Sequence, residues 1–199
     1  MFEFLFFSVY IMLMVVEGSQ EKFPAGDKSI QSCTSVCGLP SNLDFSDQAF
    51  PIQKTDSEWR EQLSNTAYDV ARNHETEPPF RNIYYDHKEL GYYSCIGCYA
   101  PMYSSLDKFD SGTGWPSFTQ PIDIRIVGET KDYSHGMTRI EVHCALCGCH
   151  QGHIFPDGPK PTNLRYCINS ASLKFIPKES IQELNTSILD WYKNTKKGK

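Results

Sequence analysis

The chain has 199 residues, enough for one domain with a proper hydrophobic core and additional tails. Its 40% hydrophobic and 22% charged residues are typical of a globular protein, so the chain as a whole is not disordered. The net charge is -5 and the one basic run, residues 196–199, lies at the C-terminus, which argues against a nucleic-acid or anionic-membrane surface.

Residues 1–18 predict a secretory signal peptide. An apolar stretch runs from Phe4 to Val16, which suits the hydrophobic region of a leader and is shorter than the about 20 residues needed to cross a bilayer. Val16 and Gly18 are the small residues expected before cleavage at Ser19. No Lys or Arg precedes the stretch, so an uncleaved anchor or a wrongly chosen start codon remains an alternative. We expect the protein in the ER lumen or outside the cell, without stable membrane insertion after leader removal.

Residues 19–54 lack a sustained hydrophobic period and predict an irregular lead-in. This segment contains Cys33 and Cys37, which could form a disulfide in an oxidising compartment.

A helix is predicted from Thr55 or Asp56, either of which can cap it, to a point before Pro78. Its apolar face recurs at helical spacing in Trp59, Leu63, Ala67 and Val70.

The segment from about 80 to 177 predicts a mainly β fold. Short stretches rich in β-branched and aromatic residues, 91–94, 122–127, 137–142 and 165–175, are separated by Gly, Pro and Asp clusters, as in antiparallel sheets. Residues 179–192 have the spacing of an amphipathic helix, within a C-terminal segment 178–199 that ends in the basic tail. Asn185 begins an N-glycosylation triplet inside that helix, and the sequence does not decide its use. We therefore expect one catalytic or binding domain at 55–177.

The spacing of four of the eight cysteines predicts a metal site. Two Cys-x-x-Cys pairs, Cys95 with Cys98 and Cys144 with Cys147, could supply the tetrahedral four-thiolate shell of a structural zinc ion. The long gap between the pairs implies that the metal joins two distant hairpins. Four thiolates leave no open position for chemistry. Two disulfides are the alternative that a secretory leader would allow.

A third cysteine lies in a strand-like stretch at 165–173. A two-residue period places Arg165, Cys167 and Asn169 on one face. The nearby cation favours the thiolate, so we expect Cys167 to be alkylated at a pH below the ordinary thiol pKa of about 8.5. A small apolar residue in a buried strand is the plainer interpretation of this cysteine.

Together with the Cys pairs, three segments resemble the methionine-R-sulfoxide reductase (MsrB) family: 109–118 (FDSGTGWPSF), 150–159 (HQGHIFPDGP) and 165–173 (RYCINSASL). The resemblance covers about residues 95–175. It implies two antiparallel sheets (a β-tent) with short flanking helices and one structural Zn²⁺ per chain, held by Cys95, Cys98, Cys144 and Cys147. The implied enzyme, a peptide-methionine (R)-S-oxide reductase, reduces the R epimer of methionine sulfoxide, usually within a protein. Such protein repair is an oxidative stress response.

The resemblance also implies roles at the site. Cys167 would be the nucleophile and would become a sulfenic acid. His150 and His153 would provide the proton, while Asn169 and Arg165 hold substrate oxygen, water and thiolate. Trp115 would pack against the substrate methyl group, and Phe155 would line the pocket or merely pack. The histidines could instead enlarge the metal site, and Trp115 could be an ordinary core aromatic.

One position departs from the family pattern. Many members carry a resolving cysteine where this chain has Thr113. Cys33, Cys37, Cys149 or an external thiol such as thioredoxin would then reduce the sulfenic acid. Our hypothesis is that the Cys33 and Cys37 pair does so.

Two other functions compete with the reductase. A secreted, zinc-stabilised β module could bind a partner with Cys167 inert, because a fold alone does not determine a function. A disulfide oxidoreductase using a Cys-x-x-Cys pair is the third, and it predicts no bound metal. The protein targets, the physiological reductant and the oligomeric state are not apparent from the sequence.

Overall fold

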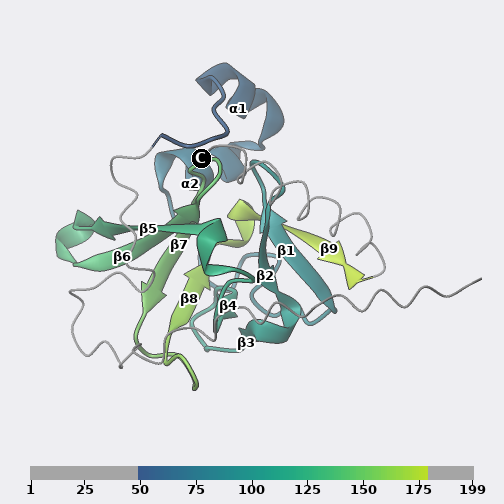
Figure 1. Cartoon of the computed structure of the whole chain (residues 1–199), viewed down its shortest axis with the longest axis vertical. Coiled ribbons are helices and arrows are strands. Elements are labelled where there is room, and N and C mark those ends of the chain that lie inside the picture. The colour runs from purple at the N-terminus through teal and green to yellow at the C-terminus, as the bar shows by residue number, and fades with distance from the viewer. Residues whose placement is uncertain (1–48, 179–199) are drawn as a thin grey trace, which may run out of the picture.

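The computed structural model describes residues 49–178, which form two antiparallel sheets and two short helices (Figure 1). The helices are α1 (Asp56–Gln62) and α2 (Asn65–Asn73). The strands are β1 (Gly91–Cys95), β2 (Pro101–Ser104), β3 (Lys108–Phe109), β4 (Ser117–Phe118), β5 (Val127–Asp132), β6 (Arg139–Cys144), β7 (His150–Phe155), β8 (Arg165–Ile168) and β9 (Leu173–Pro177). Short 3-10 turns are η1 (Ser105–Asp107), η2 (Ile124–Ile126), η3 (Ser134–Gly136) and η4 (Ser170–Ser172).

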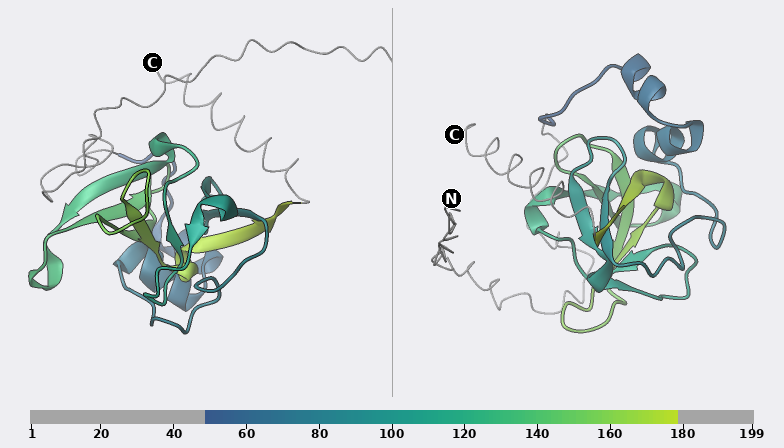
Figure 2. Two further views of the ribbon diagram at one scale, coloured as in Figure 1. Left: turned by 90° about the horizontal axis from the view of Figure 1, so that it is seen from below. Right: turned by 90° about the vertical axis from the view of Figure 1, so that its right-hand side faces the viewer.

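The two sheets differ in size, with three strands in one and six in the other. One has the order β2-β1-β9 and the other the order β3-β4-β8-β7-β6-β5. Figure 2 shows the sheets from two further sides, with the helices packed at one end. All strand pairs are antiparallel, so the predicted mainly β fold with two antiparallel sheets is confirmed.

The helical segment begins where predicted but divides in two. Thr55 caps α1 in a capping box, its side chain accepting from the Glu58 N–H while the Glu58 carboxylate accepts from the Thr55 N–H. The single helix we expected is wrong, because Leu63 is extended and the Ser64 hydroxyl accepts from Ala67 N–H, which starts α2. The predicted apolar face is confirmed, since its four residues, Trp59, Leu63, Ala67 and Val70, are all buried.

Two predicted strands also differ from the structure. Residues 124–126 form η2, because the Asp123 carboxylate accepts from Arg125 N–H and turns the chain before β5 begins at Val127. The stretch 165–175 is interrupted by η4, so β8 and β9 belong to different sheets.

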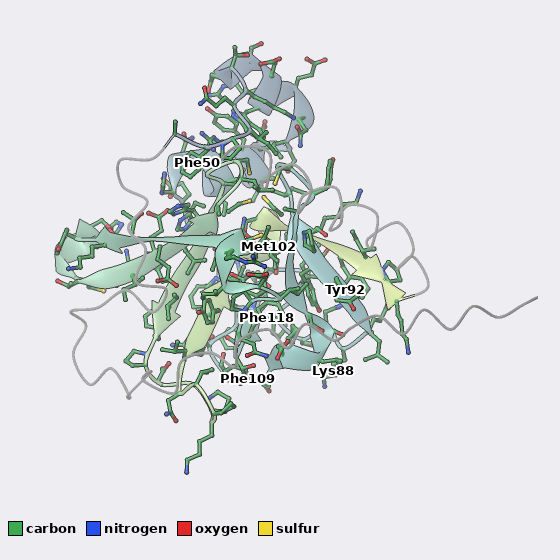
Figure 3. All side chains as sticks on the ribbon, viewed as in Figure 1. Phe50, Lys88, Tyr92, Met102, Phe109 and Phe118 are labelled. Carbon is green, nitrogen blue, oxygen red and sulfur yellow. The ribbon has the colours of Figure 1, made fainter. Side chains whose placement is uncertain are left out.

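The core lies between the two sheets. The Tyr103 ring stacks on Phe118 with centroids 4.5 Å apart, and Tyr93 meets Phe118 edge-on at 5.1 Å. Met102 and Phe118 are both fully buried, and Figure 3 shows them in the middle of the molecule. Aromatic packing therefore joins β1 and β2 of the small sheet to β4 of the large one.

Several predictions fall outside the described residues: the leader 1–18, the lead-in up to residue 48, and the helix at 179–192 with Asn185. Within residues 49–178, no helix has the length and apolar character needed to span a membrane.

Candidate active site

Strand register places a row of polar side chains across the large sheet. Cys167 on β8 lies opposite Ser117 on β4 and opposite His153 on β7. His153 in turn lies opposite Glu141 on β6. Residues directly opposite each other point to the same face of a sheet, so these side chains share one face.

Cys167 opens into a small cavity of about 120 Å³. The lining side chains come from three strands and three loops: Thr76, Trp115, Arg139, His153, Phe155, Cys167, Ile168 and Asn169. The structure thus brings five of the residues predicted from the sequence together. Two others, His150 and Arg165, lie outside this lining.

Arg165 favours the Cys167 thiolate as expected, but the net shift of the thiol pKa is upward. Burial raises the pKa of the Cys167 thiol above its ordinary value, and the charge of Arg165 and a weak hydrogen bond from Thr113 offset this only in part. The Thr113 hydroxyl oxygen lies 3.9 Å from Cys167 Sγ. The sequence pattern showed the cation but not the burial that outweighs it.

Arg165 forms an ion pair with Asp157, so the Cys167 thiol is not its only partner. Its Nε and Nη2 donate to the two Asp157 carboxylate oxygens at 2.9 and 3.0 Å. The guanidinium also lies 4.4 Å from the centre of the Phe155 ring. Arg165 therefore fixes the Phe155 ring, which forms part of the cavity wall.

A carboxylate determines which nitrogen of His153 carries the proton. His153 Nε2 lies 2.8 Å from Asp132 Oδ2. Burial opposes the charge of Asp132, but hydrogen bonds from Ser134 and His153 and the charge of Arg139 hold the pKa of that carboxyl below its usual range. An ionised carboxylate only accepts, so Nε2 of His153 donates and Nδ1 is left with a lone pair. Burial lowers the pKa of His153 to about 4, so the ring is neutral at neutral pH.

His150 sits behind His153, with ring centroids 5.5 Å apart. Its Nδ1 lies 2.6 Å from Glu141 Oε1, and the same oxygen meets His74 Nδ1 at 2.9 Å. Burial opposes the charge of Glu141, but its hydrogen bonds to the two rings lower the pKa of this carboxyl. His150 Nε2 is buried with no hydrogen-bond partner among residues 49–178. Because His150 does not line the cavity around Cys167, a hydrogen bond to this nitrogen requires a buried water molecule.

Asn169 is held between two backbone groups. Its amide nitrogen donates to the Gln151 carbonyl at 3.1 Å, and its oxygen accepts from Glu77 N–H at 3.2 Å. The Glu77 carboxylate accepts from the N–H groups of Ser170 and Ala171. A buried residue of the loop after α2 thus anchors the chain immediately after Cys167.

Trp115 is positioned by the same loop. Its indole Nε1 donates to the Glu77 carbonyl at 2.9 Å, and the neighbouring Gly114 carbonyl accepts from Phe80 N–H at 2.9 Å. Gly114 has φ +86°, and a Cβ there would meet Phe80 and Pro79 at 2.7–2.8 Å. Only glycine fits this position, so the Gly-Trp-Pro motif marks a close contact between two loops.

The two Cys-x-x-Cys pairs meet at one end of the sheets. The sulfurs of Cys95, Cys98, Cys144 and Cys147 all lie within 4.8 Å of one another, and all four thiols are free. Cys95 and Cys147 are 3.6 Å apart and Cys98 and Cys144 are 3.5 Å apart, close to the roughly 3.8 Å edge of a tetrahedron with 2.3 Å metal–sulfur bonds. These distances are far longer than the about 2.05 Å of a disulfide. The cluster could hold a metal ion.

The two Cys-x-x-Cys pairs have the same backbone turn. Tyr99 N–H donates to the Cys95 carbonyl, and Gly148 N–H donates to the Cys144 carbonyl, both at 2.9 Å. Tyr99 and Gly148 both have positive φ, +61° and +69°. This shared turn directs the two sulfurs of each pair to one side.

Cys149 is completely buried beside this cluster, where a Cβ on Gly97 would meet its sulfur at 2.4 Å. Cys33 and Cys37 lie outside the described residues. Sequence reasoning missed four carboxylates that support the site: Glu77, Asp132, Glu141 and Asp157. The alternating pattern of 137–142 indicated a strand that contains Glu141. That Glu141 pairs with His150 could not be known without the strand register.

The family model and the individual relatives of this chain indicate the same family. The sequence model of the SelR domain family matches residues 63–177, more than half of the chain. A peptide methionine sulfoxide reductase MsrB of Thioalkalivibrio sulfidiphilus is 58% identical over 125 residues, which cover 63% of this chain and 91% of that protein. MsrB proteins of Methylibium petroleiphilum and Pseudomonas aeruginosa are 51% and 50% identical, over 67% and 65% of this chain and 96% and 98% of the relatives.

Proposed function

Because this chain belongs to the SelR (MsrB) family, we propose that it reduces the R epimer of protein-bound, and also free, methionine sulfoxide with Cys167 as the nucleophile. The chain is thus an oxidoreductase, and the non-catalytic binding module is not favoured. The observation that carries the proposal is the cavity around Cys167, which places a thiol, an imidazole and two aromatic rings around a space of side-chain size.

The proposed reaction transfers one oxygen atom. Cys167 Sγ attacks the sulfoxide sulfur and forms a sulfur–sulfur bond. This bond and the sulfur–oxygen bond then break as the oxygen bonds to Sγ, so that methionine leaves and the oxygen and the thiol proton remain on Cys167 as a sulfenic acid. The methionine sulfur is reduced and the cysteine sulfur is oxidised by the same two electrons. The apolar S-methyl group packs against Trp115 and Phe155.

The proton is carried by the histidines. His153 is neutral and lies opposite Cys167, and its Nδ1 lone pair can take the thiol proton and pass it to the sulfoxide oxygen. His150 Nε2, which is unpartnered among the described residues but lies outside the cavity lining, reaches the substrate oxygen through a water molecule. In this proposal Asn169 and Arg165 hold the substrate oxygen, a water molecule and the Cys167 thiolate in place.

A thiol must then reduce the sulfenic acid. One thiol displaces water to form a disulfide with Cys167, and a second thiol releases the reduced enzyme. Thr113 cannot do this, although its hydroxyl lies 3.9 Å from Cys167 Sγ. Cys149 is buried beside the metal cluster, which disfavours exchange.

We therefore assign recycling to Cys33 and Cys37, with thioredoxin or another thiol as the final reductant. About twelve residues join Cys37 to Ala49, a length that spans up to roughly 40 Å when extended. Oxidising the enzyme with a stoichiometric amount of substrate and mapping disulfides should find Cys167 linked to one of the two. A disulfide between Cys33 and Cys37, formed as Cys167 is released, is the other product of the same scheme. Linkage of Cys167 to Cys149, or oxidised Cys167 with both Cys33 and Cys37 still reduced, would contradict this assignment.

The metal that suits the four thiols is zinc. A Zn²⁺ held by Cys95, Cys98, Cys144 and Cys147 would have a closed shell and would stabilise the fold without taking part in the reaction. The third candidate function, a Cys-x-x-Cys oxidoreductase, would require at least one of these pairs to cycle through a disulfide.

We also propose that the chain enters the secretory pathway, on the strength of the apolar stretch within residues 1–18. Mass spectrometry of the protein from its natural cells should find a mature N-terminus near Ser19. A protein that retains Met1 would contradict the proposal.

Turnover of separate R and S epimers of methionine sulfoxide, with dithiothreitol as reductant, tests the proposed reaction. We expect consumption of the R epimer alone and its loss in Cys167→Ser. A folded, metal-loaded protein that reduces neither epimer would refute the proposal.

A further inference from the structure

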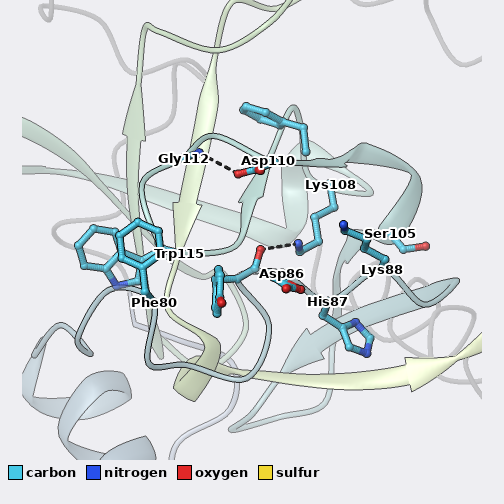
Figure 4. A pocket seen from close by; sticks show the side chains of 12 residues that line it. Phe80, Asp86, His87, Lys88, Ser105, Lys108, Asp110, Gly112 and Trp115 are labelled. Atoms are coloured by element: carbon cyan, nitrogen blue, oxygen red, sulfur yellow. Dashed lines mark hydrogen bonds between the residues drawn. The ribbon is translucent and has the colours of Figure 1, made fainter.

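A second and larger hollow, of about 470 Å³, lies beside the catalytic cavity. Its wall contains aromatic and charged side chains, among them Phe80, Tyr85, Asp86, Lys88, Lys108 and Trp115. Figure 4 shows Phe80 and Trp115 at one end and the two lysines at the other. None of these residues except Trp115 has a part in the proposed chemistry.

The two hollows share one wall. Trp115 lines both of them. In the same loop, the Thr113 hydroxyl faces Cys167 at 3.9 Å, whereas its neighbours Gly112 and Gly114 line the larger hollow. A polypeptide leaving the catalytic cavity past Trp115 would therefore enter the larger hollow directly.

The difference in size indicates what each hollow can take. A space of about 120 Å³ accommodates little more than one side chain, and typical pockets for whole small molecules are about 300–1,000 Å³. When the oxidised methionine belongs to a protein, the residues beside it must lie outside the cavity. We propose that the larger hollow is a subsite for the polypeptide next to the methionine sulfoxide and receives an apolar or aromatic side chain of that segment.

The aromatic end of the hollow supports this occupant. Phe80 is 57% exposed, and its ring meets that of Tyr85 edge-on at 5.8 Å. Its φ of +59° is unfavourable for a bulky residue, and the hydrogen bond from its N–H to Gly114 helps to hold it there. Strain that keeps an aromatic ring at the surface is typical of a binding site.

The charged end of the hollow disfavours an occupant with a net charge of either sign. Asp86 and Asp110 balance Lys88 and Lys108 in the lining. Lys108 donates to the Tyr85 carbonyl at 3.0 Å, and Asp110 accepts from Gly112 N–H at 2.9 Å. With both signs present, these groups suit the amides of a peptide backbone, while the rings take its apolar side chain.

This inference rests on the proposed function, so its test measures two substrates. The first is N-acetyl-methionine-R-sulfoxide, whose side chain fills the catalytic cavity and which has no neighbouring residue to enter the larger hollow. The second is a peptide with phenylalanine beside the R-sulfoxide. Both are assayed with dithiothreitol in the full chain, in Phe80→Ala, in Tyr85→Ala, and in Ile124→Ala as an exposed apolar control outside both linings.

We expect Phe80→Ala to lower kcat/KM for the peptide roughly three- to tenfold and to leave that for the small substrate unchanged, because only the peptide reaches the ring. Tyr85→Ala should behave likewise, which keeps the test valid if Phe80→Ala does not fold. Ile124→Ala should affect neither substrate.

Equal losses for both substrates, or no loss for either, would overturn the subsite. The same variants are then assayed with thioredoxin as the reductant. Loss confined to those assays, with dithiothreitol rates unchanged, would also overturn the subsite and assign the hollow to the reductant. Failure of the unaltered chain to reduce the small substrate would instead refute the proposed function.

Discussion

At the scale of single residues, the site is built on carboxylates that hold rings and backbone in place. Asp132 determines the tautomer of His153, Glu141 does so for His150, and Asp157 fixes Arg165. Each carboxylate leaves the supported side chain with one orientation. The reactive thiol itself receives little activation, because its burial outweighs the nearby cation.

The raised pKa of Cys167 predicts alkaline reactivity. The thiolate forms only as the pH rises through a pKa above the ordinary value of about 8.5, so alkylation of the Cys167 peptide should accelerate through that alkaline range. Arg165→Leu should move the midpoint higher, since it removes the stabilising charge. A midpoint below about 8.5, followed peptide by peptide with iodoacetamide and mass spectrometry, would contradict this account.

Glu141→Gln tests the support of His150. The uncharged amide oxygen accepts the two imidazole N–H groups more weakly than the carboxylate does, so we expect kcat/KM for the R epimer to fall roughly ten- to a hundredfold and its pH profile to change. The exposed Glu75→Gln is the control and should leave both unchanged. An unaltered pH profile in a folded Glu141→Gln protein would mean that this carboxylate has only a structural part.

At the scale of elements, β7 and β8 bring the histidines to the thiol. Alternation along the chain placed Arg165 and Cys167 on one face correctly, because a strand has a period of two. It could not reveal that His153 is the cross-strand neighbour of Cys167, since register depends on pairing between distant segments. The break between α1 and α2 was also missed, although Ser64 is a good helix cap, because the apolar spacing continues across it.

Gly152 makes the contact between these strands possible. A Cβ at this position would lie 2.0 Å from the Cys167 carbonyl oxygen, so Gly152→Ala must displace the backbone of the nucleophile. We expect a loss of about 1–3 kcal/mol in the free energy of unfolding and a clear drop in kcat/KM.

Gly112→Ala is the matched control for that substitution. Its φ of +68° carries a backbone cost, but nothing lies within 4 Å of the added carbon. Denaturant unfolding and turnover of both variants decide the matter. Equal effects in the two would show that close approach to Cys167 is unimportant.

At the scale of the whole molecule, the cysteine cluster joins the two sheets. Cys95 ends β1 of the small sheet and Cys144 ends β6 of the large one. Spacing alone was enough to predict the four-thiol cluster between distant hairpins, because each pair forms its own local turn. The larger hollow could not be predicted, since its wall comes from loops without a regular pattern.

Metal removal should therefore loosen the packing of one sheet on the other. We expect about one zinc ion per chain, and a strong chelator should lower the thermal midpoint by more than roughly 10 °C. Cys98→Ser should reduce both zinc content and stability, whereas Cys149→Ser should retain the zinc. Protein isolated without metal and with two internal disulfides would contradict this prediction.

The central claim is that Cys167 takes the oxygen atom of the sulfoxide, and a single turnover without any added reductant tests it most directly. Mixed with excess methionine-R-sulfoxide, the reduced enzyme should form about one methionine per chain at Cys167, plus a second where the Cys33 and Cys37 pair releases Cys167, and then stop with Cys167 recovered as a dimedone-trapped sulfenic acid or as a disulfide. Methionine formed while Cys167 stays reduced, or an equal yield from Cys167→Ser, would contradict it.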